Sequence, residues 1–476
     1  MQFNSFAFLF FLPAVFVLYW LVFKGQRWQN AVVVLASYVF YGWWDWRFLG
    51  LIAFTSLLSY GGGLLTERYV GKRRWQRVAC MVSIVVNLLI LGLFKYYDFF
   101  AESCSELLSL VGWQADWVTL NVVLPVGISF YTFQALSYSI DVYHGRVRAC
   151  HDVVQFMAYI SFFPQLVAGP IERANHLLPQ FRQERRFDYG TAVDGCRQML
   201  WGFFKKMVIA DNCATVVNTV WADYGSMPPP VLAVGAVLFA FQIYCDFSGY
   251  SDIAIGSARL FGIRLMRNFN NPYFAHSIAD FWRRWHISLM TWLRDYVYIP
   301  LGGNRRGRVR TLRNTFVVWG VSGLWHGANW TFVCWGLYHA TLLTFQRQIK
   351  VSVAGKYASA VLTFLLVVIG WVIFRAPTLA DATGYLSLML SPQLFNVGAA
   401  LPLLLTVQAA LAKCSAGIAF MVVCEWRGRQ GQHALHDMPR TLLLRTVALR
   451  YAFYILMAMF TVAFAGTQSE FIYFQF

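Results

Sequence analysis

Long runs of apolar residues, separated by short polar and basic segments, follow one another along the whole chain. A run of about 20 apolar residues is long enough for a helix to cross the hydrocarbon core of a bilayer. The runs do not alternate between apolar and polar positions, as the strands of a membrane β-barrel would. They predict spanning helices before Lys24 and at about residues 31–44, 48–65, 78–94, 120–143, 231–247, 358–374, 400–424 and 446–465. We therefore expect an all-α polytopic membrane protein.

The basic residues between the runs predict how the chain is oriented. Positive charges gather at every second crossing, at Lys24 and Arg27, at residues 72–77, and at Arg146 and Arg148. Because Lys and Arg are enriched in cytoplasmic loops, we expect these segments inside and the N-terminus outside. No basic segment precedes the first run and no small-residue cleavage site follows it, which favours a spanning helix over a cleaved signal peptide.

The middle of the chain is less regular. The runs near 153–170 and 197–222 are interrupted by Pro164, by Gly169 and Pro170, and by basic patches. The segment 173–186 is amphipathic and basic, so we expect it on the cytoplasmic face of the membrane.

Residues 315–345 contain no Lys, Arg, Asp or Glu, although both flanks are basic. One straight span would put a basic flank outside, so we expect a broken or re-entrant pair of helices with its break among Gly323, Gly327 and Asn329. Irregular backbone at membrane depth is tolerated where protein or a water-filled cavity surrounds it. His326 would stand at the break, where an ionisable side chain is a functional candidate. The alternative is a histidine satisfied by a backbone carbonyl.

A second histidine, His286, lies in the segment 279–296, which the pattern predicts to be one amphipathic helix. At about 100° per residue, one face of that helix would carry Arg283, His286, Met290 and Arg294, and the opposite face would be aromatic. A cationic face of this kind could hold a phosphorylated cofactor beside a proton acceptor. The alternative is an interfacial anchor whose arginines meet anionic lipid.

Two acids, Asp246 and Asp252, flank small hydroxyl residues close to apolar runs. They could pair with the arginines or orient a histidine. Capping of a helix that begins near Ser248 is the simplest single explanation.

Composition and charge narrow the class of protein. Hydrophobic residues make up 58% of the 476 residues and charged residues 13%, against about 25% charged in a soluble domain. The net charge of +17 is confined to segments between apolar runs, which disfavours nucleic acid as a partner. The nine cysteines have no metal-ligand spacing. The sequence also lacks phosphate loops, dinucleotide fingerprints, zinc-protease motifs and serine-hydrolase elbows.

Several motifs resemble one known family. DFWRRWHISLMTWLRDYVYIPLGGN (280–304) and GLWHGANWTFVCWG (323–336) resemble the paired-histidine blocks of the membrane-bound O-acyltransferases. The branch with bacterial alginate O-acetyltransferases is similar in further blocks along nearly the whole chain: PVGISFYTFQALSYSIDVY (125–143), FFPQLVAGPIERANHLLPQF (162–181), CDFSGYSDIAIGSARLFG (245–262), NFNNPYF (268–274), GWVIFR (370–375) and the terminal FIYFQF.

The resemblance implies a fold and a set of site residues. It implies a ring of about 11–13 transmembrane and re-entrant helices around a central funnel, in one integral-membrane domain over 1–476 with N-terminal spans (1–150), a catalytic core (151–350) and C-terminal spans (351–476). His326 matches the family's catalytic histidine and His286 its second active-site histidine. A role for Arg283, Arg284 and Arg294 in binding cofactor phosphates is our own inference, as is Tyr473 as an acyl relay, for which aromatic packing is the alternative.

The function implied is acetyl transfer at the bacterial inner membrane. A cytoplasmic thioester, acetyl-CoA, would supply the acetyl group for an exported polysaccharide such as alginate, through a periplasmic transferase or relay partner. No metal and no permanently bound cofactor are expected. D-alanyl transfer to a cell-wall polymer is the alternative within the enzyme class. A transporter or flippase that uses the histidines as a proton relay, and a non-catalytic scaffold, are the alternatives from other classes.

Overall fold

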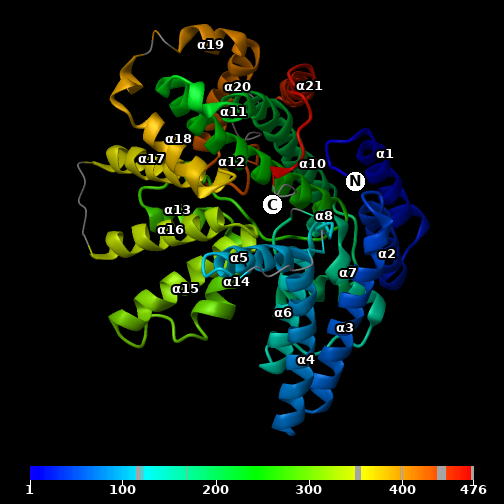
Figure 1. Ribbon diagram of the computed structural model, residues 1–476. Coiled ribbons are helices and arrows are strands. Elements are labelled where there is room, and N and C mark those ends of the chain that lie inside the picture. Colours follow the sequence, from blue (N-terminus) through cyan, green and yellow to red (C-terminus); the bar gives the residue numbers. More distant parts are fainter. Residues whose placement is uncertain are drawn as a thin grey trace. The chain divides into compact units, whose positions relative to one another are not determined.

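The computed structural model describes residues 1–113, 119–120, 122–167, 169–348, 355–396, 398, 400–436 and 446–472. Within these ranges the regular structure is helical, without a β-strand, so the predicted all-α class is confirmed (Figure 1). The chain divides into two compact units, Met1–Gly195 with Ser257–Met266 and Cys196–Gly256 with Arg267–Phe476. A single functional domain over the whole chain stays a prediction, as do the ring and the funnel.

The first unit contains the N-terminal helices and the start of α10, which continues into the second unit. Its helices are α1 (Phe6–Val17), α2 (Gln26–Gly42), α3 (Leu49–Arg68), α4 (Arg73–Leu91), α5 (Tyr97–Ser109), α6 (Ile128–Tyr143), α7 (Val153–Ser161), α8 (Phe163–Leu166), α9 (Ala174–Arg182) and α10 (Tyr189–Phe203).

The second unit contains the remaining helices, except that the last residues of α12, from Ser257 onward, belong to the first unit. They are α11 (Asp211–Ala222), α12 (Pro229–Leu260), α13 (Ile278–Arg284), α14 (Ile287–Leu293), α15 (Arg308–His326), α16 (Trp330–Gln348), α17 (Lys356–Arg375), α18 (Leu379–Met389), α19 (Leu401–Thr406), α20 (Gln408–Arg427) and α21 (Val447–Ala463).

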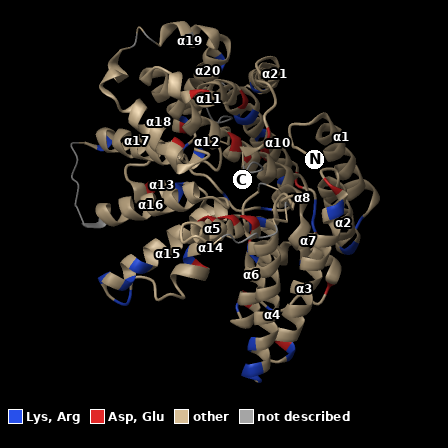
Figure 2. Cartoon of the chain, viewed as in Figure 1, with Lys and Arg blue, Asp and Glu red and all other residues tan. Residues whose placement is uncertain are grey.

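Several helices have the length and apolar character that a bilayer requires, so the chain is a multi-pass membrane protein. Five stretches of the described chain qualify as spans: Trp46–Arg68, Arg73–Ser109, Pro229–Leu260, Lys356–Arg375 and Gln408–Arg427. Phe6–Val22 and Val447–Ala463 are shorter apolar helices. Lys and Arg gather at helix ends, as at the start of α4 and at the start of α15 (Figure 2).

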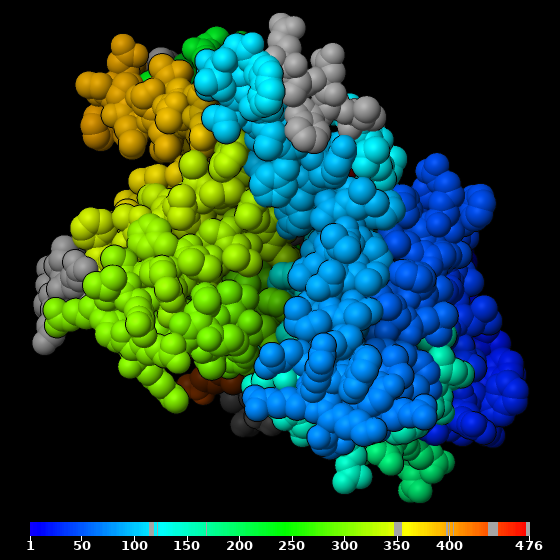
Figure 3. Space-filling view, turned by 60° about the horizontal axis from the view of Figure 1, so that its bottom comes forward, coloured from blue at the N-terminus to red at the C-terminus, as the bar shows by residue number. Residues whose placement is uncertain are grey.

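Helix α3 buries small polar residues and exposes apolar ones, as expected of a helix in lipid. On α3, Ser56 and Ser59 are buried whereas Phe54 is 53% exposed. Ser83 of α4 is 2.9 Å from Ser139 of α6, between their hydroxyl oxygens. Small residues and interhelical hydrogen bonds drive association where the hydrophobic effect gives no preference for the interior. The outward side chains of α1 to α4, in shades of blue, form one continuous surface (Figure 3).

The ends of several helices differ from the predicted runs. The run expected at 120–143 becomes helical only at Ile128, after Gly127 adopts a left-handed backbone with φ of 77°. α12 is much longer than its predicted run and ends at Leu260. The run at 400–424 is divided into α19 and α20 at Val407. The run at 153–170 is interrupted as predicted. α7 ends at Ser161, Pro164 lies in the first turn of the short α8, and Gly169 follows the end of α8.

The uncharged segment 315–345 forms the predicted pair of helices. α15 ends at His326, α16 begins at Trp330, and Gly327 and Asn329 lie between them. Gly323 faces Phe332, and Gly336 faces Trp319, each so closely that an added Cβ atom would lie 2.2 Å from the opposing carbonyl oxygen. The two helices therefore run antiparallel in close backbone contact, which returns the chain to the side from which it came.

Candidate active site

His326 is the last residue of α15 and lies in an aromatic cage. Its side chain is buried, and its ring centroid is 5.0 Å from that of Trp335 on α16 and 5.4 Å from that of Phe374 on α17. Trp325, the preceding residue, is also 5.0 Å away. α15 ends here because Gly327 continues in an extended conformation. The predicted position of His326 at the break is therefore confirmed.

His286 does not lie inside a helix, and the prediction of one amphipathic helix over 279–296 is wrong. α13 ends at Arg284, His286 has a left-handed backbone with φ of 44°, and α14 begins at Ile287. A left-handed conformation is unfavourable for a residue with a side chain. The backbone NH of Asn270 donates to Arg284 O, and that of Ile287 donates to Asn268 O, each at 2.9 Å. These two bonds hold the break open.

Asn268 also fixes the His286 side chain, which is 1% exposed. Its Oδ1 lies 3.2 Å from Nδ1 of His286 and accepts a hydrogen bond of 2.9 Å from Ser288 Oγ. Asn268 Nδ2 in turn donates to Ser251 Oγ on α12 at 3.3 Å. With Nδ1 facing an amide oxygen, Nδ1 carries the proton and Nε2 keeps its lone pair. Nε2 has no hydrogen-bond partner among the described residues.

The tertiary structure brings the two histidines together although they are 40 positions apart in sequence. Their ring centroids are 6.4 Å apart. Trp325 packs against both rings, with its centroid 5.5 Å from that of His286. Phe247 of α12 also contacts His286, with 4.7 Å between ring centroids. The result is a pair of buried imidazoles enclosed by aromatic rings, in which a proton acceptor is shielded from water.

Arg283 and Arg294 do not share a helix face with His286, and Arg284, the third arginine predicted to bind cofactor phosphates, also pairs elsewhere. The side chain of Arg283 is 72% exposed, that of Arg284 30% and that of Arg294 59%. Arg283 and Arg284 pair with Asp280 at 3.4 and 3.1 Å, and Arg294 pairs with Asp295 at 2.7 Å. The expected shared face is therefore wrong, because the break at His286 turns the histidine inward while the arginines stay outside. A role in cofactor binding stays a prediction. Tyr473 lies outside the described residues.

Two lysines that sequence reasoning missed neutralise the acids of α12. They lie in the π-helical segment Phe204–Ala210, which links α10 to α11. Lys205 Nζ is 2.6 Å from Asp252 Oδ2, and Lys206 Nζ is 2.9 Å from Asp246 Oδ1. Both acids lie well inside α12, which begins at Pro229. Capping of a helix near Ser248 is therefore wrong, and the acids pair with lysines rather than arginines.

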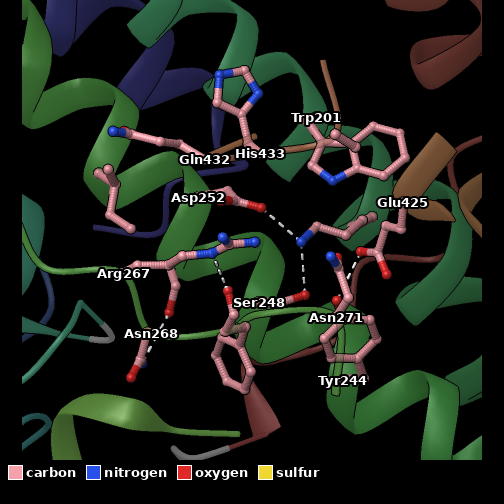
Figure 4. A pocket seen from close by; sticks show the side chains of 15 residues that line it. Trp201, Tyr244, Ser248, Asp252, Arg267, Asn268, Asn271, Glu425, Gln432 and His433 are labelled. Atoms are coloured by element: carbon pink, nitrogen blue, oxygen red, sulfur yellow. Dashed lines mark hydrogen bonds and ion pairs between the residues drawn. The ribbon is translucent and has the colours of Figure 1, made fainter. Parts of the chain in front are cut away.

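A polar cavity opens beside Asn268 and is lined by charged side chains. Asp252 and the hydroxyl of Ser248 converge on the ammonium of Lys205, and Tyr244 donates to Glu425 at 2.7 Å (Figure 4). Arg267 donates to Phe269 O at 2.6 Å. The free volume is about 20 Å³, room for about one water molecule. This cavity is a neutralised charge cluster beside His286 rather than a space for a substrate.

The last described residues of the chain are anchored close to the same wall. Lys206 Nζ also lies 2.8 Å from Asp211 and donates to Ser469 O at 3.0 Å. The backbone NH of Ile472 donates to Asp246 Oδ2 at 2.7 Å. Phe471 packs on Phe247, the residue that contacts His286, with 5.8 Å between ring centroids. The chain end therefore reaches the ring next to the histidine pair.

A third buried histidine, His339 on α16, is not among the candidates predicted from the sequence. Its Nδ1 accepts a hydrogen bond from Trp282 Nε1 at 3.3 Å, and its ring is 5.1 Å from Trp335, the residue that packs on His326. Its presence in the same uncharged segment as His326 was the available signal.

Comparison with known proteins places this geometry in a family. Residues 146–373, which include both histidines, match the model of the membrane-bound O-acyltransferase family. A protein of Pseudomonas aeruginosa named probable alginate O-acetylase is 44% identical over 386 residues, or 80% of this chain and 73% of that protein. The peptidoglycan O-acetyltransferase of Helicobacter pylori is 34% identical over 424 residues, or 80% and 78%.

A more distant relative acts on another polymer. The teichoic acid D-alanyltransferase of Bacillus subtilis is 25% identical over 314 residues, which cover 61% of this chain and 76% of that protein. All three names describe acyl transfer. The resemblance predicted from the histidine motifs is thereby confirmed. The chain is an acyltransferase, and it belongs to the membrane-bound O-acyltransferase family.

Proposed function

We propose that this enzyme transfers an acetyl group from acetyl-CoA to a hydroxyl group destined for an exported polysaccharide of the alginate type. The pair of buried imidazoles, His326 at the break between α15 and α16 and His286 at the break between α13 and α14, carries the proposal. Their ring centroids are 6.4 Å apart. The names of relatives at 41–44% identity support acetyl as the group and alginate as the polymer. The enzyme works in the bacterial inner membrane, with acetyl-CoA reaching it from the cytoplasm.

In this proposal His326 is the general base. It takes the proton of the acceptor hydroxyl while the hydroxyl oxygen attacks the carbonyl carbon of the thioester. The C–S bond then breaks, and the departing thiolate takes the proton from His326. His286, oriented by Asn268, presents Nε2 to the same space and shares or orients the proton. The aromatic cage excludes water, which would otherwise hydrolyse the thioester.

The remaining predicted residues have roles at the two ends of the reaction. The phosphates of acetyl-CoA are bound by Arg283, Arg284 and Arg294. These arginines leave their carboxylate partners for the phosphates, because a guanidinium group binds a carboxylate and a phosphate in the same bidentate way. Tyr473 follows the anchored Ile472 and relays the acetyl group to a periplasmic transferase. An Arg283→Gln/Arg294→Gln variant should raise KM for acetyl-CoA and leave kcat unchanged, and a Tyr473→Phe variant should block transfer to the partner.

The decisive experiment compares His326→Ala with His144→Ala, a change at an exposed histidine after α6. We expect His326→Ala to abolish acetylation of the polysaccharide, a loss of at least about 100-fold for a missing general base, with normal amounts of protein in the membrane. The measurement is mass spectrometry of the polymer from cells that carry each variant, together with acetyl-CoA consumption in membranes. Normal acetylation in His326→Ala would refute the proposal. Acylation of peptidoglycan instead of alginate would change the acceptor but keep the chemistry.

A further inference from the structure

A second cavity, in the first unit of the chain, has no part in the proposed reaction. It has a volume of about 870 Å³, within the range of about 300–1,000 Å³ typical of small-molecule sites. Its walls are the end of α3, the loop between α6 and α7, and one face of α9. The residues of α9 that line it fall on one face of the helix along its whole length, at Ala174, Asn175, Leu178, Pro179 and Arg182.

The carboxylates that line this cavity already have partners. Glu67 lies 2.7 Å from His151 Nε2 through one oxygen, and its other oxygen accepts the backbone NH of Ala149 at 3.0 Å. Asp152 caps α7 and accepts the backbone NH groups of Val154 and Gln155 at 2.9 and 3.0 Å. Both acids are therefore held by hydrogen bonds within the wall.

The arginines of the cavity are in the opposite situation. Arg146 pairs with Asp141 at 3.1 Å, outside the lining. Arg148 and Arg182 are exposed, line the cavity, and form no ion pair with a carboxylate in the part of the chain that the structure describes. They come from different elements, the α6–α7 loop and the last turn of α9. Two arginines without a carboxylate partner among the described residues therefore line the same cavity.

The start of α9 contributes a further attraction for anions. Ala174 and Asn175 both line the cavity, and the cap residue of α9 forms no side-chain hydrogen bond with the first turn. The free NH groups of a helix N-terminus, together with the helix dipole, favour a phosphate group. Arg side chains bind phosphate in a bidentate manner.

We propose that this cavity binds a phosphate-bearing ligand, with Arg148 and Arg182 as its main contacts. The phosphate belongs to a phospholipid headgroup or to a soluble phosphate compound. Basic pockets beside membrane helices suit the first source, because anionic lipids concentrate there. The volume of the cavity suits either source. The site is separate from the histidine pair and does not depend on the proposed acetyl transfer.

The test uses the full chain, purified in a neutral detergent and in nanodiscs, with two probes. Pyrophosphate is titrated against the detergent-solubilised protein by calorimetry. Phosphatidylglycerol retention is measured by native mass spectrometry after transfer from nanodiscs with phosphatidylcholine. We expect the wild-type protein to bind at least one probe. Arg148→Gln/Arg182→Gln should bind that probe at least about tenfold more weakly, because it loses the charged hydrogen bonds to the phosphate group.

The matched control is Arg73→Gln/Arg77→Gln, which removes two exposed arginines of α4 that do not line the cavity. It should bind as the wild type does. Arg148→Lys/Arg182→Lys keeps both positive charges, and its affinity for the probe should lie between those of the wild type and the glutamine variant. Such an intermediate affinity would show that the weaker binding of the glutamine variant does not come from misfolding. Pyrophosphate binding identifies a soluble source, and lipid retention alone identifies a headgroup. Absence of binding by the wild type to both probes, or equal weakening in the glutamine variant and the α4 control, would overturn the proposal.

Discussion

At the scale of single residues, the structure shows how a histidine can be oriented before any substrate arrives. His286 is held by its backbone, through Ile287 and Asn268, and by its ring, through Asn268 Oδ1. A hydrogen bond to one imidazole nitrogen decides which tautomer the other nitrogen presents. The second ring nitrogen, Nε2, has no hydrogen-bond partner among the described residues.

The first prediction concerns Asn268 as a positioning residue. Asn268→Ala should lower kcat by about 10–100-fold, the usual cost of losing such an outer partner of a histidine, with little change in KM. Asn268→Asp keeps the accepting oxygen and should restore much of kcat. Its negative charge beside Nδ1 favours the protonated imidazole and should therefore move the acidic limb of the pH–rate profile to higher pH. The measurement is steady-state acetyl transfer as a function of pH. Equal kcat values for the alanine variant and the wild type would contradict this role.

At the scale of elements, the α15–α16 hairpin supplies most of the cage. Its helices approach so closely at Gly323 and Gly336 that no side chain fits between their backbones. Small residues allow this approach in a membrane, where packing and hydrogen bonds decide which helices pair. The position of His326 follows from the hairpin, because the break that returns the chain also ends α15 at that residue.

The second prediction uses two glycines of this hairpin. Gly336→Ala should lower the thermal midpoint in detergent and reduce activity, since the new Cβ atom would lie 2.2 Å from Trp319 O and overpacking costs about 1–3 kcal/mol. Gly320→Ala, on α15 itself, is the matched control because its Cβ atom would meet nothing within 4 Å. It should leave the midpoint unchanged or raise it, as Ala favours helix over Gly. Equal behaviour of the two variants would refute the close approach.

At the scale of the whole molecule, the charges buried in the second unit tie distant parts of the chain together. Lys206, from the segment between α10 and α11, meets Asp246 of α12 and Ser469 near the end of the chain. Ions are costly in an apolar interior unless they are paired and hydrogen-bonded. The cluster of Lys206, Asp211 and Asp246 therefore holds the C-terminal segment to the wall beside the histidines.

The third prediction tests this anchor. Lys206→Met should destabilise the protein by about 3–5 kcal/mol, because two buried carboxylates lose their cation, and should expose the C-terminal segment to carboxypeptidase. Lys24→Met, at an exposed lysine, is the control and should change neither property. The measurements are thermal unfolding in detergent and mass spectrometry of the intact chain after protease treatment. An unchanged midpoint together with a protected C-terminus would show that the cluster does not anchor the chain end.

The sequence by itself determined the fold class, the family and the pair of histidines. Apolar runs of span length leave a chain few alternatives to membrane helices, because each backbone NH and C=O in lipid must bond within its own helix. The sequence also predicted the break near His326. Residues 315–345 carry no charge and have basic residues on both sides, so a single span would place one basic flank outside the cell, and the glycines near the middle offer a place for the chain to turn. These are local properties, and they survive in the structure.

Only the tertiary structure decided how the site is assembled. The segment 279–296 has the pattern of one helix, yet it breaks at His286 because the distant Asn268 and Asn270 take over its backbone hydrogen bonds. The partners of Asp246 and Asp252 are lysines from another segment of the chain. A hydrogen bond or ion pair between residues far apart in sequence leaves no periodic trace along the chain. The sequence therefore supplied the reactive groups, while their orientation and neutralisation arose from packing.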